Sequence, residues 1–145
     1  MQLSENFKFE EFYHSDIANK KGIKNIPNQE QFVNIVRLHD NCMAVIRKSL
    51  GHKVFISSGF RCKELNSCKE INGAKNSQHL TGKACDFTVE GQSNMSIFNW
   101  CNAHLNFDQL ILERVNGKEW VHISFDYGKN RKDALIYDGK QYKKV

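Results

Sequence analysis

The sequence contains a single proline, Pro27, and no stretch rich in glycine and serine that would mark a linker between domains. Internal repeats and low-complexity segments are also absent. A chain of 145 residues is long enough to bury one hydrophobic core. These features predict a single domain that spans residues 1–145.

No run of apolar residues approaches the roughly 20 that a membrane span requires, so we expect no membrane insertion. The first twelve residues are acidic and aromatic, and they lack the basic and then apolar pattern of a secretory signal. We therefore expect a protein that is made in the cytoplasm without a signal peptide.

A C-x-x-C pair is also missing, which argues against a thiolate zinc knuckle or a thioredoxin-like motif. The five cysteines have scattered spacing, and they are Cys42, Cys62, Cys68, Cys85 and Cys101. We expect mostly reduced, buried thiols, because a free cysteine behaves as a small hydrophobic residue. The sequence leaves open whether Cys62 and Cys68 pair.

The composition is that of a folded protein, with 40% hydrophobic and 11% aromatic residues. The net charge of +5 favours an anionic partner, which could be a cell-wall polymer or a nucleic acid. Neither an arginine-aromatic repeat nor zinc-finger spacing is present, so we expect no nucleic-acid partner.

Hydrophobic periodicity predicts helices in the first two thirds of the chain. Apolar residues recur with helical period from 28 to 50, and Gly51 follows as a stop. Residues 93–105 give a second helix, capped by Ser93. A short capped helix beginning at Ser4 is expected to pack three aromatic residues, Phe7, Phe9 and Phe12.

Segments rich in β-branched and aromatic residues predict strands at 53–60, 83–90, 107–113 and 119–126. Asn116-Gly117 is typical of a tight hairpin turn, and residues 133–145 give a second hairpin that turns at Asp138-Gly139. Early helices and late strands predict an α+β fold with a small, mainly antiparallel sheet and helices packed on one side.

Alternation along the strand 83–90 directs Cys85 to the core and Asp86 to the opposite face, toward a cleft or solvent. In the strand 119–126, His122 is a polar residue between apolar neighbours. If the two strands are antiparallel neighbours, Asp86 and His122 can meet, because directly opposed Cβ atoms lie about 5 Å apart.

A further histidine, His79, lies in the loop before the first of these strands, and Gly82 would let that loop fold back. Two imidazoles and one carboxylate form a three-ligand zinc set with one position open for water, which is the catalytic arrangement. The spacing is also compatible with residues that have no role in a metal site. Isolated histidines are commonly surface residues, and Asp86 could be a solvated carboxylate at a strand edge.

Catalysis at such a centre also needs a base. Glu119 lies three residues before His122, but regular alternation puts it on the other face of the strand. It can join the site only if the strand is irregular at its entry. Glu113 is an alternative base, or it simply ends its strand.

Two stretches resemble the signatures of the zinc D-Ala-D-Ala carboxypeptidase family: "SQHLTGKACD" at 77–86 and "EWVHIS" at 119–124. This family belongs to a wider group of lysostaphin-type, D-Ala-D-Ala and hedgehog-type zinc folds. The resemblance covers most of the chain, because flanking segments are also similar at 3–12, 56–66, 107–113 and 129–135.

The resemblance implies three ligands for Zn²⁺, which are His79, Asp86 and His122. It also implies that Glu119 is the general base and then the proton donor to the leaving amine. Arg61 would steady the developing oxyanion, and Ser77 and Gln78 would line the pocket or hold His79. The loop 66–76 is less rich in glycine than its usual counterparts, so specificity is the property least transferable from the family.

These expectations describe a zinc metallopeptidase that hydrolyses peptide bonds in peptidoglycan stem peptides, as a D,D-carboxypeptidase or an endopeptidase. It would be a phage or prophage protein that acts at the bacterial cell wall, either as an endolysin or carried on a virion with other virion proteins. The alternative is a non-catalytic, zinc-containing binding or virion structural domain on the same fold. The presence of both Glu119 and Arg61 favours the enzyme.

Overall fold

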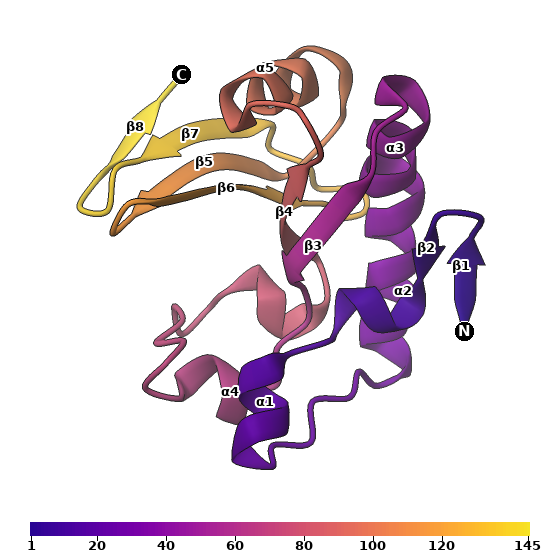
Figure 1. The fold of residues 1–145 in the computed structure, drawn as a ribbon, viewed down its shortest axis with the longest axis vertical. Helices are drawn as coiled ribbons and strands as arrows, with labels where there is room; N and C mark the ends of the chain where they lie inside the picture. Colours follow the sequence, from indigo (N-terminus) through magenta and orange to yellow (C-terminus); the bar gives the residue numbers. More distant parts are fainter.

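The computed structural model describes all 145 residues, and its chain begins with a small hairpin (Figure 1). Strands β1 (Gln2–Ser4) and β2 (Phe7–Lys8) pair, and the 3₁₀ helix η1 (Phe9–Phe12) follows. The prediction of a helix from Ser4 is therefore wrong. At 100° per residue, a helix would set Phe7 and Phe12 about 140° apart, whereas the hairpin and 3₁₀ turn bury both rings together.

The predicted helix 28–50 is confirmed as one continuous helical run, built from α2 (Gln29–Leu38), a π-helical turn (His39–Met43) and α3 (Ala44–Leu50). The Asn28 side chain accepts from the backbone of Gln31 at its start, and Gly51 ends it in the left-handed conformation. A short helix that the sequence analysis did not predict, α1 (Asp16–Lys21), precedes this run.

Six strands form the main sheet: β3 (Val54–Ser58), β4 (Ala84–Val89), β5 (Gln109–Val115), β6 (Lys118–Ser124), β7 (Asp133–Tyr137) and β8 (Tyr142–Lys144). Their order is β3-β4-β6-β5-β7-β8, and every neighbouring pair is antiparallel except β5 and β7. The predicted α+β fold with a mainly antiparallel sheet is confirmed. The parallel pair arises because residues 125–132 cross over before β7 begins.

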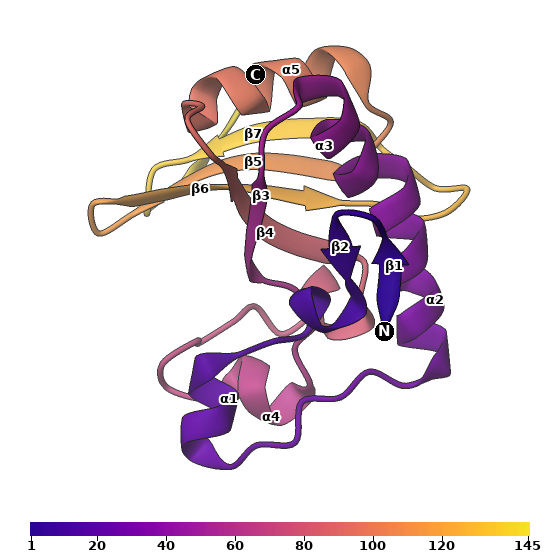
Figure 2. The same cartoon turned by 45° about the vertical axis from the view of Figure 1, so that its right-hand side comes forward.

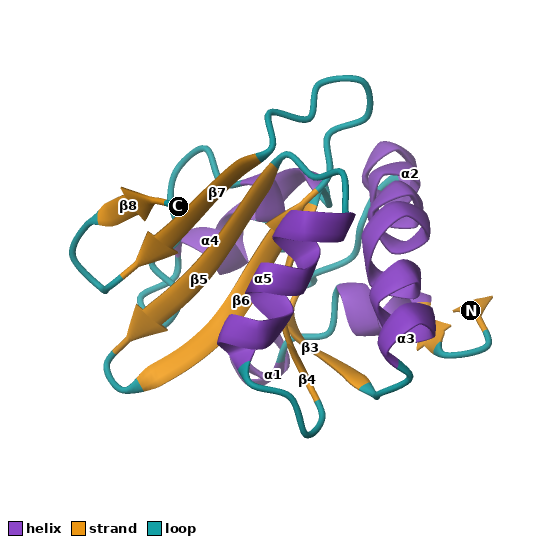
Figure 3. Cartoon of the chain, turned by 90° about the horizontal axis from the view of Figure 1, so that it is seen from above, coloured by secondary structure: helices purple, strands orange, loops and turns teal.

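Helix α5 (Asn94–His104) lies against one face of β5 and β6, and the long helical run lies beside β3 and β4 (Figures 2 and 3). The inward residues of β4 and β6 join this core, as expected for Cys85 and Phe87. The short helix α4 (Lys63–Ser67) and α1 lie together beyond the ends of β3 and β4 (Figure 1). No helix combines the length and apolarity that crossing a membrane would require.

All five cysteines are free thiols. Three of them, Cys42, Cys85 and Cys101, are fully buried, and burial raises the pKa of each thiol. Cys62 and Cys68 are partly buried and unpaired. The expectation of reduced thiols, with most of them in the core, agrees with this arrangement.

Candidate functional site

Asp86 on β4 and His122 on β6 are direct partners in the antiparallel register. The Nδ1 atom of His122 lies 3.0 Å from Oδ1 of Asp86, and both side chains are buried. The predicted meeting of these two residues on one face of the sheet is confirmed. The opposite face of the same strands carries the core residues Cys85 and Ile123.

His79 reaches the same point from the 3₁₀ helix η3 (Gln78–Thr81), which directly precedes β4. Ser77 caps this turn by accepting from the backbone N–H of His79, and Gly82 ends it with φ of 77°. A Cβ at Gly82 would lie only 2.7 Å from the carbonyl oxygen of Gln31. Gly82 therefore supplies both the positive φ and the close approach to α2 that fix His79.

The ring of His79 is held by a backbone carbonyl. Its Nδ1 lies 2.7 Å from the oxygen of Gly59, and because a carbonyl can only accept, Nδ1 carries the hydrogen. Nε2 is then left with a free lone pair, 3.4 Å from Oδ1 of Asp86. A metal-binding histidine is commonly oriented by such a bond to its other ring nitrogen.

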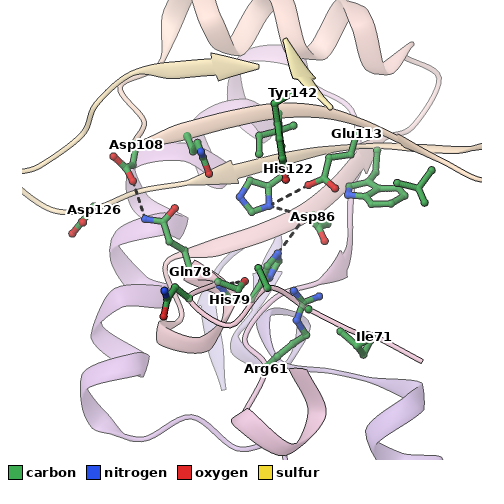
Figure 4. Close-up of a pocket in the computed structure, with 18 of the residues that line it drawn as sticks. Arg61, Ile71, Gln78, His79, Asp86, Asp108, Glu113, His122, Asp126 and Tyr142 are labelled. Carbon is green, nitrogen blue, oxygen red and sulfur yellow. Dashed lines mark hydrogen bonds and ion pairs between the residues drawn. The ribbon is translucent and has the colours of Figure 1, made fainter. Parts of the chain in front are cut away.

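One ligand atom from each of His79, Asp86 and His122 can be chosen so that all three lie within 4.8 Å of one another (Figure 4). Burial lowers the pKa of His79, although Asp86 opposes this, which favours the neutral, ligating imidazole. Burial works against the charge on Asp86, but His79 and His122 outweigh it and hold the pKa of the carboxyl below its ordinary range. Two imidazoles and a carboxylate are a donor set that fits zinc better than magnesium or calcium, which prefer all-oxygen sites.

Arg61 lies beside this cluster, just after β3. Its Nη1 donates to Ser58 and its Nε to the side chain of Asn66, which is itself buried. Asn66 packs against Gly73 so closely that a Cβ there would lie 2.0 Å from its Oδ1. Burial lowers the pKa of the Arg61 guanidinium, and the charges of Asp86 and Glu113 oppose this, so the guanidinium remains a cation aimed at the cluster.

The structure does not bring Glu119 to the cluster. Strands β5 and β6 pair without a bulge at this end, so Arg114 opposes Glu119, and both lie on the face away from His122. The Glu119 carboxylate accepts from Arg114 Nε at 2.8 Å and from the Asn94 side chain at 3.1 Å. The hydrogen bond from Arg114 lowers the pKa of Glu119, as in an ordinary surface ion pair.

Glu113 is the carboxylate that shares the face of His122. Its Oε1 lies 3.8 Å from His122 Nδ1, and its side chain is largely buried in the cleft (Figure 4). Burial and then the charge of Asp86 raise the pKa of Glu113. The signal for this position was in the sequence: a two-residue turn at Asn116-Gly117 aligns Ile111 with His122, and alternation then puts Glu113 on the same face.

Gln78 is held by Asp108, a buried carboxylate that the sequence analysis did not single out. The Nε2 of Gln78 donates to Asp108 Oδ2 at 2.8 Å, and Arg131 binds the same carboxylate through Nε and Nη2. These bonds, with those of Arg131 first, lower the pKa of Asp108 to about 2. A lone aspartate before a strand gives no sequence signal of such a role.

The cluster, Arg61 and Glu113 all line one cleft of about 920 Å³. Beyond the predicted site residues, Ser77 and Gln78 among them, its walls include the loop at 71–76, side chains of β5 and β6, the crossing segment after β6, and Tyr142 of β8. Trp120 on β6 lies in this wall, and its indole Nε1 is buried without a hydrogen-bond partner. The metal-type ligands are thus at the floor of an open groove large enough for several residues of a peptide.

A comparison with family models finds a match to the family described as Peptidase M15, over residues 5–124. The match includes every residue of the cluster together with Arg61, Glu113 and Glu119. A search of curated proteins finds no match to the chain.

Proposed function

Because the chain belongs to the M15 peptidase family, we propose that it is a zinc-dependent peptidase with His79, Asp86 and His122 as the metal ligands. The observation that carries this proposal is the meeting of these three donors at the floor of a cleft, with Glu113 and Arg61 beside them. A carboxylate whose pKa is raised, next to a metal-type donor set, is what a general base of a metallopeptidase requires.

A zinc ion bound by these donors would polarise the substrate carbonyl and lower the pKa of an attacking water. Glu113 would accept a proton from that water and pass it to the leaving amine, since its carboxylate shares the face of the cluster. Arg61 would donate to the carbonyl oxygen as negative charge develops there, and its bonds to Ser58 and Asn66 pre-organise the guanidinium. In this assignment Glu119 stabilises the β5–β6 hairpin and takes no part in the chemistry.

The substrate class that we propose is the stem peptide of peptidoglycan, which suits an open cleft on a basic protein. Cleavage would be by a D,D-carboxypeptidase or an endopeptidase reaction. We also propose that the protein serves a phage or prophage and acts at the bacterial cell wall, as an endolysin or alongside virion proteins.

The proposal is tested by digesting purified peptidoglycan with the full chain and identifying the released muropeptides by mass spectrometry. We expect new amino groups, and we expect their release to stop on treatment with a chelator and to return when zinc is restored. Unchanged muropeptides in the presence of zinc would reject the peptidase assignment. They would favour the non-catalytic binding domain in its place.

A further inference from the structure

We propose that Lys129 and Arg131 form a carboxylate-binding end of the cleft, which selects peptides that carry an acidic group about three residues from the cleaved bond. This inference rests on the proposed peptidase function and adds to it the chemical class of substrate. Figure 4 shows the geometry: Asp108 and Asp126 lie on one side of His122, and Arg61 and Ile71 lie on the other.

The guanidinium of Arg131 is held in place by the buried carboxylate of Asp108. Asp108, only 2% exposed, accepts from Arg131 Nε at 2.9 Å, from Nη2 at 2.9 Å and from its backbone N–H at 3.0 Å. The remaining nitrogen, Nη1, makes no hydrogen bond or ion pair, and the side chain is 59% exposed. Arg131 lines the cleft, and its two side-chain bonds to Asp108 hold the guanidinium in one orientation with Nη1 unused, which is the condition for a directional bond to a carboxylate.

Lys129 adds a second cation with no partner of its own. Nearby Asp126 is occupied by Lys83, whose Nζ lies 2.9 Å from its Oδ1, and no carboxylate pairs with the Lys129 ammonium. Asp108 pairs with Arg131 and Asp126 with Lys83, so Lys129 is a cation in the cleft wall without a carboxylate partner. An anionic group on the substrate is what would supply that partner.

The separation of this end from the cluster follows from the strand register. Ile111 opposes His122, and Asp108 lies three residues earlier, where its N–H donates to the carbonyl of Ser124. At about 3.3 Å per residue, the two levels are roughly 10 Å apart. A peptide lying extended along the cleft would cover that distance with about three residues, so the bound carboxylate would not belong to the residue next to the cut.

The two cations of this end follow the range matched to the family model, in the segment 129–135 that also resembles the family, whereas Asp108, which positions Arg131, lies inside that range. The match to Peptidase M15 stops at residue 124, and both Lys129 and Arg131 belong to the segment that crosses from β6 to β7. The metal-type cluster lies wholly within the matched range.

The test uses synthetic stem peptides in which one carboxylate at a time is converted to a carboxamide. One set alters an internal carboxylate about three residues from the cut, and a second set alters the terminal carboxylate beside the cut. Each peptide is assayed for kcat/KM with the native chain. Its Kd is measured separately with the Glu113→Gln variant, which should bind without turnover.

We expect the native chain to prefer the internal acid over its amide by about tenfold or more, as befits charge-assisted hydrogen bonds. The preference should fall toward unity in Lys129→Gln and in Arg131→Lys, which retains the charge facing Asp108. The matched control is Lys48→Gln, an exposed lysine on α3, which should keep the full preference.

Equal handling of internal acid and amide by the native chain would overturn the proposal, as would a preference that survives in the Lys129→Gln/Arg131→Lys double variant. A preference confined to the terminal carboxylate would overturn it too. If no peptide is cut but the Kd values show the Arg131-dependent preference, the carboxylate-binding end stands and the peptidase assignment fails.

Discussion

Asp86 and His122 face each other across the antiparallel pair of β4 and β6, with His122 Nδ1 3.0 Å from Asp86 Oδ1. Two strands that are distant in sequence thus position two of the three donors through the hydrogen bonds of one antiparallel pair. Only His79 comes from a turn, and its position depends on the backbone around it.

Replacing His79 with alanine should abolish zinc binding and peptide cleavage, because two remaining donors cannot hold zinc in a catalytic site. Metal analysis should find about one zinc per native chain and far less in the variant. His104→Ala is the matched control, since His104 is an exposed histidine on α5. Normal zinc content in His79→Ala would show that the cluster is not the metal site.

Glu113→Gln should lower kcat by about 10²–10⁴-fold while zinc stays bound, because it removes the base and keeps the shape of the side chain. Glu119→Gln should leave kcat within about twofold and cost only about 0.2–1 kcal/mol of stability, as expected for an exposed ion pair. Steady-state kinetics and urea unfolding measure the two effects. The reverse pattern of kcat losses would return the role of base to Glu119.

Gly82→Ala should destabilise the fold by about 2–4 kcal/mol and weaken zinc binding. A side chain there adopts an unfavourable positive φ and meets the Gln31 carbonyl, so η3 must shift with His79 on it. Gly91→Ala separates the two causes, since Gly91 has φ of 72° but open space around its Cβ position. Its cost should be about 1 kcal/mol, with zinc affinity unchanged. Equal losses in both variants would mean that contact with α2 is unimportant.

Asp108→Asn should make the free energy of unfolding less dependent on acid pH. The pKa of Asp108 is about 2 in the folded chain, below its ordinary value of 3.8, so its stabilising charge is fully present above about pH 4. That stability is lost as the pH falls through the folded pKa. Allowing for solvent at the exposed Arg131, the native chain should lose about 1–2 kcal/mol more than the variant between pH 5 and pH 2.

Chemical denaturation at several pH values provides the measurement, and the difference between the two proteins removes the contribution of every other carboxylate. Parallel stability curves for the native chain and Asp108→Asn would contradict the assigned coupling to Arg131.

Strand alternation was sufficient to predict the central relationship of the site. The patterns of 83–90 and 119–126 gave the core side of Cys85 and the meeting of Asp86 with His122, since period-2 geometry follows directly from sequence. The helix at 28–50 was equally readable, because its capping residue Asn28 and the terminal Gly51 bracket an apolar stripe.

The same alternation explains where the prediction failed. Glu119 lies three positions before His122, and that spacing puts two side chains on one face of a helix but on opposite faces of a strand. The family resemblance implied that Glu119 acts beside His122. In the structure, Glu119 pairs regularly with Arg114, and this register directs its side chain away from the cleft. The parallel pairing of β5 with β7 and the contact of Asp108 with Arg131 both depend on the path that the chain takes between β6 and β7. The local sequence pattern does not determine that path.

The two-residue turn at Asn116-Gly117 touches neither the cluster nor the cleft, yet it sets the alignment of Ile111 with His122 and so the face on which Glu113 lies. The length of this turn sets the register of β5 against β6. A slide of β5 against β6 by one position would turn Glu113 to the core face and the buried Leu110 and Leu112 to the cleft, so the turn and the two leucines together fix the face of Glu113. A redesign of this remote turn must therefore preserve the pairing of Ile111 with His122 if Glu113 is to stay in the cleft.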